Sequence, residues 1–547
     1  MVERIIKAKC KFCGKVADEV SSTVVGAKTI NGQRTQYIQK KLRCGHTILE
    51  KLVETIDVYD ITSEDGRSLF PYQKDSVKFL ETTNFRGLIA HEMGLGKTVI
   101  SLAALKLHAK DLCPTLIVCK SGLKMQWFTE CIRWIGEDYV PQLISSSRDV
   151  PYWNMFKVFI VSLDLLRNCK WTDDVMKGKT PVKTLILDEV QMIKNSGSSR
   201  TQKVRDMSRG VKHIMALSGT PIKNRASEYF PILNILKPER FHEETAFASE
   251  YLFTYNDAAS GRIVKGGLAK GAVDKFRENT KDFVIRYTRE EVMPDLPKVF
   301  RMYNYHNIGD SIQVEYEKAY EDFEDTYDEL EGNMGRSRSD GGGNILAKMS
   351  KMRHLAGRAK ILPTVEYLKE FLENTELRIA VFAHHIDVQT IIHSQISKWM
   401  VEHGMKPALS YMGAGQDANA KWKAQSEFTD PNGSRVMIIS MLAGGEGLNL
   451  QATCGDCVMV ERQWNPANEE QCEARFPRPG SKFEKINATY LVALNSIDEL
   501  FAQIIEKKRA MFAQVVDGKD DVKFDESSIM KDLADEVRRR GKPLWAA

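Results

Sequence analysis

Short apolar runs alternate with longer, mostly polar spacers through much of the chain. In the first half, the apolar runs are residues 88–90, 115–119, 158–161, 184–187 and 213–217. Uninterrupted apolar runs of this length are typical of strands buried on both faces of a parallel sheet, and the spacers suit crossover helices. The pattern predicts a doubly wound parallel α/β sheet.

A second set of the same kind begins near Arg378, with apolar runs at 379–382, 436–439, 458–460 and 489–494. A chain of 547 residues also exceeds what one hydrophobic core supports. We therefore predict an α/β fold with two doubly wound lobes. The predicted parts are a small module at 1–60, a first lobe at 61–235, a helical insertion with a flexible loop at 236–345, a second lobe at 346–512 and a helical tail at 513–547.

A glycine-rich loop follows the first apolar run. Gly94 and Gly96 allow the backbone to turn its N–H groups toward phosphate oxygens, Lys97 adds a positive charge, and Thr98 offers a hydroxyl to Mg²⁺. The usual first glycine of this pattern is His91 here. The alternative is a glycine turn before an ordinary helix. The predicted ATP-binding residues of this P-loop are Met93, Gly94, Leu95, Gly96, Lys97 and Thr98.

Two acidic residues, Asp188 and Glu189, directly follow the run 184–187. They should lie at the carboxyl edge of the sheet, where α/β proteins bind ligands. We expect Asp188 to hold Mg²⁺ together with Thr98, and Glu189 to activate the attacking water. Upstream, the amide of Gln73 can read adenine, and Tyr72 or Phe70 can stack on the ring.

The second set of runs carries two further candidate elements. Gly445 and Gly447 lie in a glycine-rich strand exit, where the backbone can approach a ligand closely. Arg475 and Arg478 are three residues apart, so both guanidinium groups can face one way on a helical turn. They can stabilise the charge that develops on the γ-phosphoryl group, provided that they reach ATP across a cleft between the lobes. The alternative is a pair of surface arginines.

The N-terminal module carries two pairs of potential metal ligands, Cys10 with Cys13 and Cys44 with His46. This spacing suits a structural Cys₃His zinc site of the ribbon type. A segment this small buries little apolar surface, so metal binding would supply folding free energy. The alternative is that these are incidental cysteines and a surface histidine.

The charge of the chain is concentrated in this module. Residues 1–56 contain 11 Lys and Arg against 5 Asp and Glu, whereas the whole chain has a net charge of only +5. A solvated basic face is the simpler explanation, and nucleic-acid binding is the alternative. The chain has no apolar stretch of membrane-spanning length and no secretion-signal core at its start, so we expect an intracellular protein, cytoplasmic in a bacterial or phage-infected cell. The ten cysteines then read as reduced core thiols.

Several segments resemble the Swi/Snf-type ATPases of helicase superfamily two. In the first half they are HEMGLGKT (91–98), LIVCKSGLKMQWFTE (116–130), LILDEVQMIKN (185–195), ALSGTPIKNR (216–225) and FVIRYTREEVMPDLPKV (283–299). In the second half they are FAHHIDVQ (382–389), MLAGGEGLNLQ (441–451), RQWNP (462–466) and the arginine segment. The resemblance covers roughly residues 65–510.

The resemblance implies an ATP- and Mg²⁺-dependent motor of two RecA-like lobes that moves along double-stranded DNA as a monomer. It implies that hydrolysis is coupled to movement through Gln191, Ser218, Gly219, Thr220 and Pro221. It also places residues near the nucleic acid, namely Lys120, Ser121, Gln126, Trp127, Ser162 and His384.

The sequence departs from the family pattern at four positions. Gln191 replaces the usual His of the acidic motif, and Ala474, Pro477 and Ser481 replace Asp, His and Gln around the arginines. These departures keep two alternatives open: a helicase or annealing helicase directed to forks or junctions, and a DNA-binding scaffold with an impaired ATPase. The expected partners beyond duplex DNA are DNA-bound proteins or branched DNA.

Overall fold

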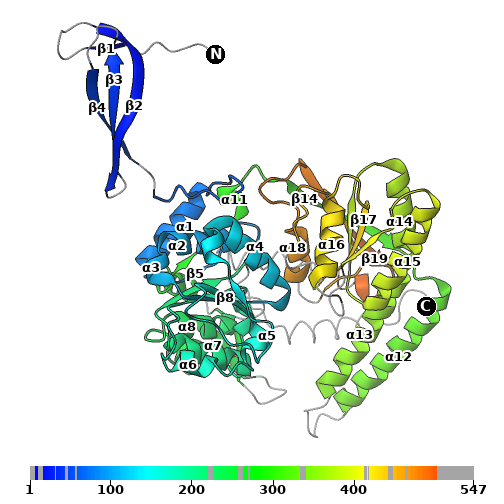
Figure 1. The fold of residues 1–547 in the computed structure, drawn as a ribbon. Coiled ribbons are helices and arrows are strands. Elements are labelled where there is room, and N and C mark those ends of the chain that lie inside the picture. The colour runs from blue at the N-terminus through cyan, green and yellow to red at the C-terminus, as the bar shows by residue number, and fades with distance from the viewer. Residues whose placement is uncertain are drawn as a thin grey trace. The chain divides into compact units, whose positions relative to one another are not determined.

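The structure is a computed structural model that describes residues 7–9, 16–30, 33–42, 47–55, 58–219, 226–256, 263–268, 271–332, 341–411, 416, 418–441, 448–463, 466–499 and 501 (Figure 1). The chain forms two compact units, Met1–Val77 and Lys78–Ala547. Among the described residues, no helix combines the length and the apolar composition that crossing a membrane requires.

The first unit contains a four-stranded antiparallel sheet in the order β1-β2-β3-β4. The strands are β1 (Lys7–Lys9), β2 (Val16–Ile30), β3 (Gln33–Leu42) and β4 (Thr47–Thr55). The four predicted zinc ligands, Cys10, Cys13, Cys44 and His46, lie outside the described residues. The helix α1 (Pro71–Thr82) begins in this unit.

The second unit contains a seven-stranded sheet in the order β13-β5-β10-β9-β6-β8-β7, and every neighbouring pair is parallel. This confirms the predicted α/β class of the first lobe. Its strands are β5 (Arg86–Ile89), β6 (Thr115–Cys119), β7 (Gln142–Leu143), β8 (Val158–Ser162), β9 (Thr184–Leu187), β10 (His213–Leu217) and β13 (Val284–Ile285).

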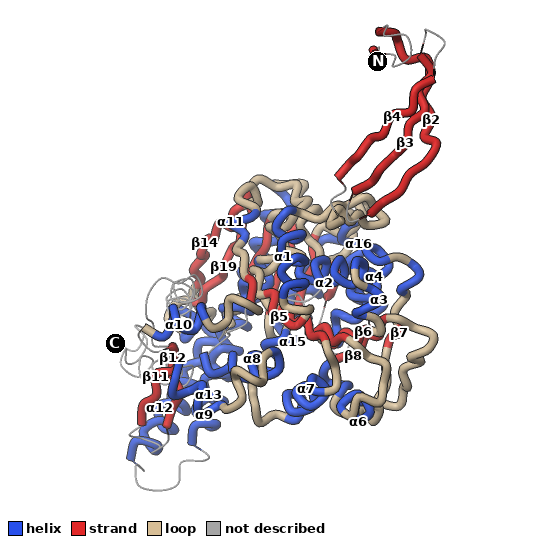
Figure 2. The backbone as a smooth tube through the Cα atoms, turned by 90° about the vertical axis from the view of Figure 1, so that its left-hand side faces the viewer, coloured by secondary structure: helices blue, strands red, loops and turns tan. Residues whose placement is uncertain are grey.

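Helices cover both faces of this sheet (Figures 1 and 2). One face carries α2 (Lys97–Leu107) and α4 (Lys124–Ile135), and the other carries α7 (Ser199–Arg209) and α8 (Phe230–Leu236). The shorter helices of the lobe are α3 (Ala109–Leu112), α5 (Leu163–Leu166), α6 (Thr172–Met176), η1 (Ser121–Leu123), η2 (Glu137–Tyr139), η3 (Val190–Ile193) and η4 (Ala226–Tyr229).

A six-stranded parallel sheet in the order β14-β19-β18-β15-β17-β16 forms the second lobe. Alternate residues of β15 belong to different cores: Ile379 and Val381 pack with α14 and α15, whereas Ala380 and Phe382 pack with α16 and α18. The elements are β14 (Lys298–His306), β15 (Ile379–Ala383), β16 (Leu409–Tyr411), β17 (Val436–Ser440), β18 (Asp456–Met459), β19 (Lys485–Ala493), α14 (Ile361–Asn374), α15 (Ile386–Glu402), α16 (Ala418–Thr429) and α18 (Pro466–Glu473).

The segment 236–345, predicted as a helical insertion, also supplies a strand to each sheet. β13 joins the first sheet beside β5, and β14 joins the second beside β19. Periodicity does not reveal them, because β13 has two residues and β14 is a partly exposed edge strand that mixes polar and apolar residues. The other elements are α9 (Glu244–Tyr251), β11 (Leu252–Asn256), β12 (Ile263–Leu268), α10 (Ala272–Glu278), α11 (Arg289–Val292) and α12 (Asp310–Gly332), which packs against α13 (Gly341–Ala359).

Candidate nucleotide-binding site

The predicted phosphate-binding and acidic residues meet at one edge of the first sheet. β10 pairs with β5 on one side and β9 on the other, so Ala216 lies beside both Leu88 and Leu187. The Ser218 N–H donates to the carbonyl of Ile89 at 3.1 Å, which extends this alignment past the strand ends. The carboxyl ends of the three strands therefore bring the P-loop, Asp188 and Ser218 together.

The P-loop has the backbone conformation that its glycines predict. Gly94 and Gly96 have φ values of 90° and 69°, in the left-handed region that side chains other than glycine rarely adopt. Gly96 caps α2, and it has no side chain that could accept from the first N–H groups of that helix. These groups are therefore left to an anion at the positive end of the helix dipole.

Lys97 is held by its own loop. Its ammonium donates to the carbonyls of His91 at 2.9 Å and Glu92 at 3.2 Å. Burial lowers the pKa of Lys97 to about 8, although the carboxylates of Glu189 and Asp188 act in the opposite direction. The loop carbonyls thus stabilise the charged amine in the position from which it would meet a phosphate.

His91, which replaces the first glycine of the pattern, is fully buried. Its Nδ1 accepts from the backbone N–H of Tyr287 at 3.1 Å, and the two rings lie 5.1 Å apart. Burial lowers the pKa of His91 to about 3, and the charges of Lys97 and Arg286 act in the same direction. The imidazole is therefore neutral and links the P-loop to the segment around Tyr287.

The acidic pair is close to the lysine, and the backbone of Glu189 is strained. Asp188 accepts a 2.8 Å hydrogen bond from the indole N–H of Trp127 and a 2.9 Å bond from the backbone N–H of Glu189. Burial, followed by repulsion from Glu189, raises the pKa of Asp188 to about 6. Glu189 has φ 48°, a left-handed conformation that costs energy for a residue with a side chain and that is concentrated at functional sites.

Gln191 connects the acidic pair to the end of β10. Its amide nitrogen donates to Glu189, and its oxygen accepts a 2.6 Å hydrogen bond from the hydroxyl of Ser218. Both Gln191 and Ser218 are buried. A Cβ at Gly219 would lie 2.4 Å from Cγ of Met93, so only glycine allows this close approach to the P-loop. Thr220 and Pro221 lie outside the described residues.

The predicted arginine pair lies on the turn that follows α18. Arg478 donates to the carbonyl of Ala474 at 2.9 Å and to the side chain of Asn449 at 2.8 Å. A Cβ at Gly94 would lie 3.6 Å from Cγ of Arg478, so this turn packs on the P-loop. Arg475 is 9% exposed and donates to the carbonyl of Gln471 at 3.2 Å.

Cationic neighbours make this region electropositive. Burial lowers the pKa of Arg478, and the charges of Arg475 and Arg289 add to the effect. An anion is the natural counterpart of such a cluster. Gly445 and Gly447, predicted to approach the same ligand, lie outside the described residues.

Two of the residues predicted near nucleic acid are buried, and their contact with nucleic acid remains a prediction. Trp127 is 2% exposed because it lies on the apolar face of α4, where its indole reaches Asp188. Ser162 is 5% exposed at the end of β8. Of the others, Ser121 is exposed, and Lys120, Gln126 and His384 are partly buried.

The predicted adenine-binding residues hydrogen-bond to each other within the first unit. The side-chain oxygen of Gln73 accepts from the backbone N–H of Phe70 at 3.0 Å, and its nitrogen donates to the hydroxyl of Tyr72 at 3.4 Å. The rings of Phe70 and Tyr72 stack at 6.0 Å. Their contact with adenine remains a prediction.

Arg286 and Arg289 also contact the P-loop segment, and the sequence did not predict these contacts. Arg289 donates to the Glu92 carboxylate through its backbone N–H at 2.8 Å and through Nε at 2.5 Å. Arg286 donates to the carbonyl of Ala90 at 2.9 Å. The family resemblance includes segment 283–299, but it assigned no role to the side chains of this segment.

The cysteines of the described residues are buried and form no disulfide bonds among the described residues, as expected for reduced core thiols. Cys454 and Cys457, which have the spacing of half a metal site, are among them. No group of three or more His, Cys, Asp and Glu side chains in the described part of the chain is arranged to hold a metal ion.

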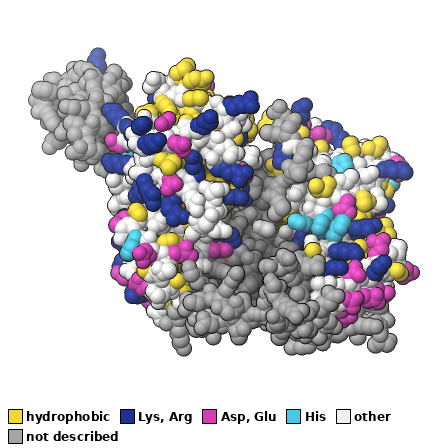
Figure 3. Space-filling view, turned by 90° about the horizontal axis from the view of Figure 1, so that it is seen from below, with side chains coloured by type: hydrophobic (Ala, Val, Ile, Leu, Met, Phe, Trp, Pro, Cys, Tyr) yellow, Lys and Arg dark blue, Asp and Glu magenta, His cyan; other side chains and the backbone are white. Residues whose placement is uncertain are grey.

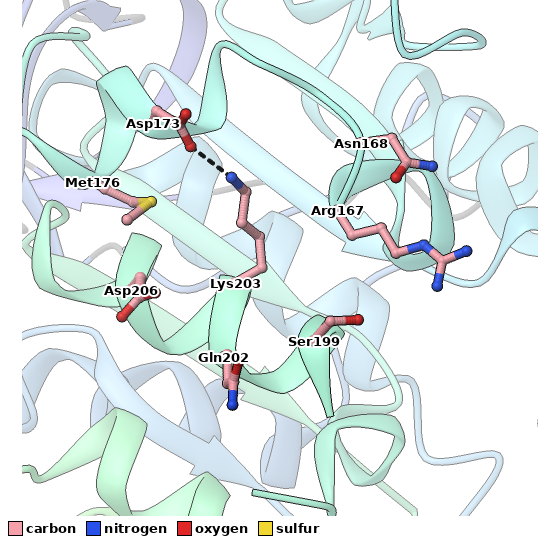
Figure 4. Close-up of a pocket in the computed structure, with 8 residues that line it drawn as sticks. All are labelled: Arg167, Asn168, Asp173, Met176, Ser199, Gln202, Lys203 and Asp206. Carbon is pink, nitrogen blue, oxygen red and sulfur yellow. Dashed lines mark hydrogen bonds and ion pairs between the residues drawn. The ribbon is translucent and has the colours of Figure 1, made fainter. Parts of the chain in front are cut away.

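One surface pocket lies away from this site. It has a volume of about 470 Å³ beside α7, and Figure 4 shows Lys203 reaching from this helix to Asp173 across it. The predicted site residues do not line it. Figure 3 shows Lys and Arg side chains interspersed with Asp and Glu on the face in view, in line with the small net charge.

Comparisons with known proteins agree with the sequence resemblance. The human DNA annealing helicase and endonuclease ZRANB3 is 25% identical over 454 residues, which are 82% of this chain and 40% of that protein. An uncharacterized ATP-dependent helicase of Mycoplasma pneumoniae is 26% identical over 510 residues, 87% of this chain and 45% of that protein. The chain thus spans less than half the length of these two relatives.

A solved structure, the Sulfolobus solfataricus SWI2/SNF2 ATPase core in complex with dsDNA, matches 89% of this chain and 98% of its own with 19% identity and a TM-score of 0.40. The family described as SNF2-related domain matches residues 72–357, more than half of the chain. The protein therefore belongs to the SNF2-related family.

Proposed function

We propose that this protein is an ATP- and Mg²⁺-dependent motor that moves along double-stranded DNA. The observation that carries the proposal is the meeting of two distant segments: the arginine turn of the second lobe packs on the P-loop of the first, next to Gly94. A nucleotide in the P-loop would then touch both lobes. Its hydrolysis would release one lobe from the other.

The residues of the site fit a nucleotide and a magnesium ion. The uncapped start of α2 and the ammonium of Lys97 suit the phosphates, and the Asp188 carboxylate and Thr98 hydroxyl are oxygen ligands of the kind that Mg²⁺ prefers. The ion would neutralise charge on the phosphates. Glu189 would orient and deprotonate the attacking water, and its contact with Gln191 would fix the direction of its carboxylate.

The arginines would complete the site. Guanidinium groups remain charged and can donate several hydrogen bonds to phosphoryl oxygens, which is worth about a thousandfold or more in rate in related reactions. In the structure, Arg478 already donates to neutral partners, the Ala474 carbonyl and the Asn449 amide. A phosphate is a stronger acceptor than either, so ATP would draw this side chain toward the P-loop.

Steady-state ATP hydrolysis with duplex, single-stranded and forked DNA tests the proposal. We expect hydrolysis in the presence of duplex DNA to exceed the rate without DNA. An absence of hydrolysis on every DNA would favour the DNA-binding scaffold. The same assay on DNA of increasing length separates translocation from static stimulation, because a translocating enzyme hydrolyses more ATP per binding event on longer DNA.

A second candidate function is an annealing helicase directed to forks or junctions. The similarity to the human DNA annealing helicase and endonuclease over 82% of this chain supports it. Stimulation by forked DNA well above that by duplex of the same length is the result that would select this activity.

We also propose a structural zinc ion in the first unit. The support is topological: Lys9 pairs with Val16, Lys41 pairs with Thr47, and β2 runs antiparallel to β3. The strand ends that flank residues 10–15 and those that flank 43–46 therefore lie at the same end of the sheet. Metal analysis of the purified protein should find one zinc per chain, and Cys13→Ser should lose it.

A further inference from the structure

The connection between the lobes is attached at both ends to the nucleotide site. It leaves the first sheet after β13, passes through α11, and enters the second sheet as β14. Arg289 at its start and Arg301 within β14 each bind a glutamate that neighbours a site element. These two ion pairs are the basis of the inference.

The first ion pair reaches the P-loop through Glu92. The carboxylate of Glu92 accepts from both the backbone N–H and Nε of Arg289. The carbonyl of the same residue accepts from Lys97, and its N–H donates to the carbonyl of Tyr287 at 2.9 Å. One residue thus joins the phosphate-binding lysine to the start of the connection.

The second ion pair reaches the arginine turn through Glu473. Arg301 donates to the two carboxylate oxygens of Glu473 at 2.7 and 2.6 Å, a bidentate geometry. The side chain of Glu473 is 4% exposed and also accepts a 2.6 Å hydrogen bond from the hydroxyl of Tyr490. Glu473 is the last residue of α18 and comes two positions before Arg475. The orientation of the arginine turn therefore depends on β14.

The stretch between the two ion pairs is short and stiff. α11 begins with a capping box between Thr288 and Glu291, which fixes its first turn. Pro294 and Pro297 follow it and restrict the backbone. β14 then pairs with β19 over its whole length, from Lys298 to His306. A displacement of Arg289 is accordingly passed to Arg301 rather than absorbed between them.

Nucleotide binding would act on the first end of this stretch. Lys97 must exchange the carbonyls of His91 and Glu92 for phosphate oxygens, which frees the carbonyl of Glu92 and changes the position of its residue. The Arg289 pair moves with Glu92. This step rests on the proposed function, because it requires that Lys97 binds the phosphates of ATP.

We infer that the segment from Arg289 to Arg301 is a strut that transmits the state of the P-loop to the arginine turn, with Glu92 and Glu473 as its two attachment points. Glu92, Arg289, Arg301 and Glu473 are positioning residues: they act on the reaction through Lys97 and through Arg475 and Arg478. The strut aligns the arginines when the P-loop is filled.

The test is a double-mutant cycle with Glu92→Gln and Glu473→Gln, which keep the side-chain shape and remove the charge. Each single variant should lower the kcat of duplex-stimulated hydrolysis about tenfold while the KM for ATP stays within about threefold. The kcat of the double variant should also be about tenfold lower than that of wild type, because the loss of one attachment point already ends the coupling. Independent local effects would multiply to about a hundredfold and would overturn the inference.

A control variant and a replacement variant complete this experiment. Arg240→Gln breaks another bidentate pair, with Asp282 at 2.7 and 3.0 Å, and should leave kcat unchanged. If Glu473→Gln does not fold, Arg301→Gln, whose side chain is 31% exposed, takes its place in the cycle.

Hydrogen exchange can detect the coupling between the P-loop and α18 in the absence of ATP hydrolysis. A non-hydrolysable ATP analogue should change exchange in α18 of the wild type and leave α18 unchanged in Glu92→Gln at saturating analogue. An equal change in both proteins would contradict the strut. A wild type that binds the analogue but does not hydrolyse ATP would instead count against the proposed function.

Discussion

The hydroxyl of Ser218 donates a 2.6 Å hydrogen bond to the side-chain oxygen of Gln191. Because the Gln191 nitrogen donates to Glu189, the end of β10 is joined to the residue proposed to activate water. An amide can accept at one end and donate at the other, so glutamine serves as a connector in the position where the family usually has histidine. This substitution is therefore compatible with coupling between hydrolysis and movement.

Removing the hydroxyl should disconnect the two elements. Ser218→Ala leaves the buried oxygen of Gln191 without its donor, so Gln191 and Glu189 lose their fixed orientation. We expect kcat for ATP hydrolysis to fall about tenfold, with little change in nucleotide affinity. Ser208→Ala is the matched control, because Ser208 makes a hydrogen bond of the same 2.6 Å length to the carbonyl of Arg205, away from the site. Equal rates for the two variants would argue against the connection.

Substitutions of two neighbouring residues on α4 should weaken the binding of different ligands, Mg²⁺ in one variant and DNA in the other. Trp127→Phe keeps the aromatic ring but removes the hydrogen bond to Asp188, so the apparent affinity for Mg²⁺ should fall severalfold while the Kd for duplex DNA is unchanged. Gln126→Ala should weaken DNA binding and leave the Mg²⁺ requirement as it is. Titrations of both variants with Mg²⁺ and with labelled duplex measure the two quantities. A loss of DNA affinity in Trp127→Phe would support the role near nucleic acid that the sequence predicts.

Steric contact between Gly219 and Met93 gives a third test. Gly219→Ala would place its methyl group 2.4 Å from Cγ of Met93, so the Met93 side chain of the P-loop must move and nucleotide affinity should fall about tenfold. Met93→Ala should restore much of the affinity in the double variant, since it removes the atom that clashes. Binding of a fluorescent ATP analogue checks both steps. Absence of any rescue would mean that Gly219 is required for another reason.

Acid should weaken the second lobe through Glu461. This carboxylate is 1% exposed and accepts from the backbone N–H groups of His384 and His385 at 2.6 and 2.9 Å. Burial by itself raises the pKa of Glu461, but hydrogen bonds and charge from His385 outweigh it and lower the pKa to about 2.

A carboxylate with a lowered pKa stabilises the folded state above its unfolded pKa, and this stability is lost as the pH falls toward the folded pKa. Glu461→Gln should therefore cost roughly 3 kcal/mol at neutral pH, and the difference from wild type should vanish between about pH 4.5 and pH 2. Urea unfolding followed by circular dichroism at several pH values measures it. A difference that is independent of pH would contradict the assignment.

The alternation of apolar runs and helical spacers was sufficient to predict both parallel sheets. Strands such as β9 and β10 are buried along their whole length, so their residues are apolar after Thr184 and His213, which begin them. The apolar pattern did not predict β14, because it is an edge strand in which exposed Phe300 and Met302 alternate with polar residues.

The P-loop and its acids could be predicted because their chemistry depends on local spacing. The contacts of Trp127, Glu92 and Arg289 could not be predicted, because they join segments that are far apart in the sequence. Arg289 contacts Glu92 although the two residues are 197 positions apart in the sequence. Trp127 also lies in a motif associated with nucleic acid, yet the helical position of its side chain turns it toward the sheet and Asp188.

The central claim is that one ATP molecule is shared between Lys97 of the first lobe and Arg478 of the second. The most direct measurement is steady-state ATP hydrolysis by wild type, Lys97→Ala, Arg478→Ala and the exposed-arginine control Arg209→Ala, each with and without duplex DNA. We expect DNA-stimulated hydrolysis in wild type and Arg209→Ala, and losses of about a thousandfold in Lys97→Ala and Arg478→Ala. Hydrolysis at the wild-type rate by Lys97→Ala or Arg478→Ala would contradict the claim.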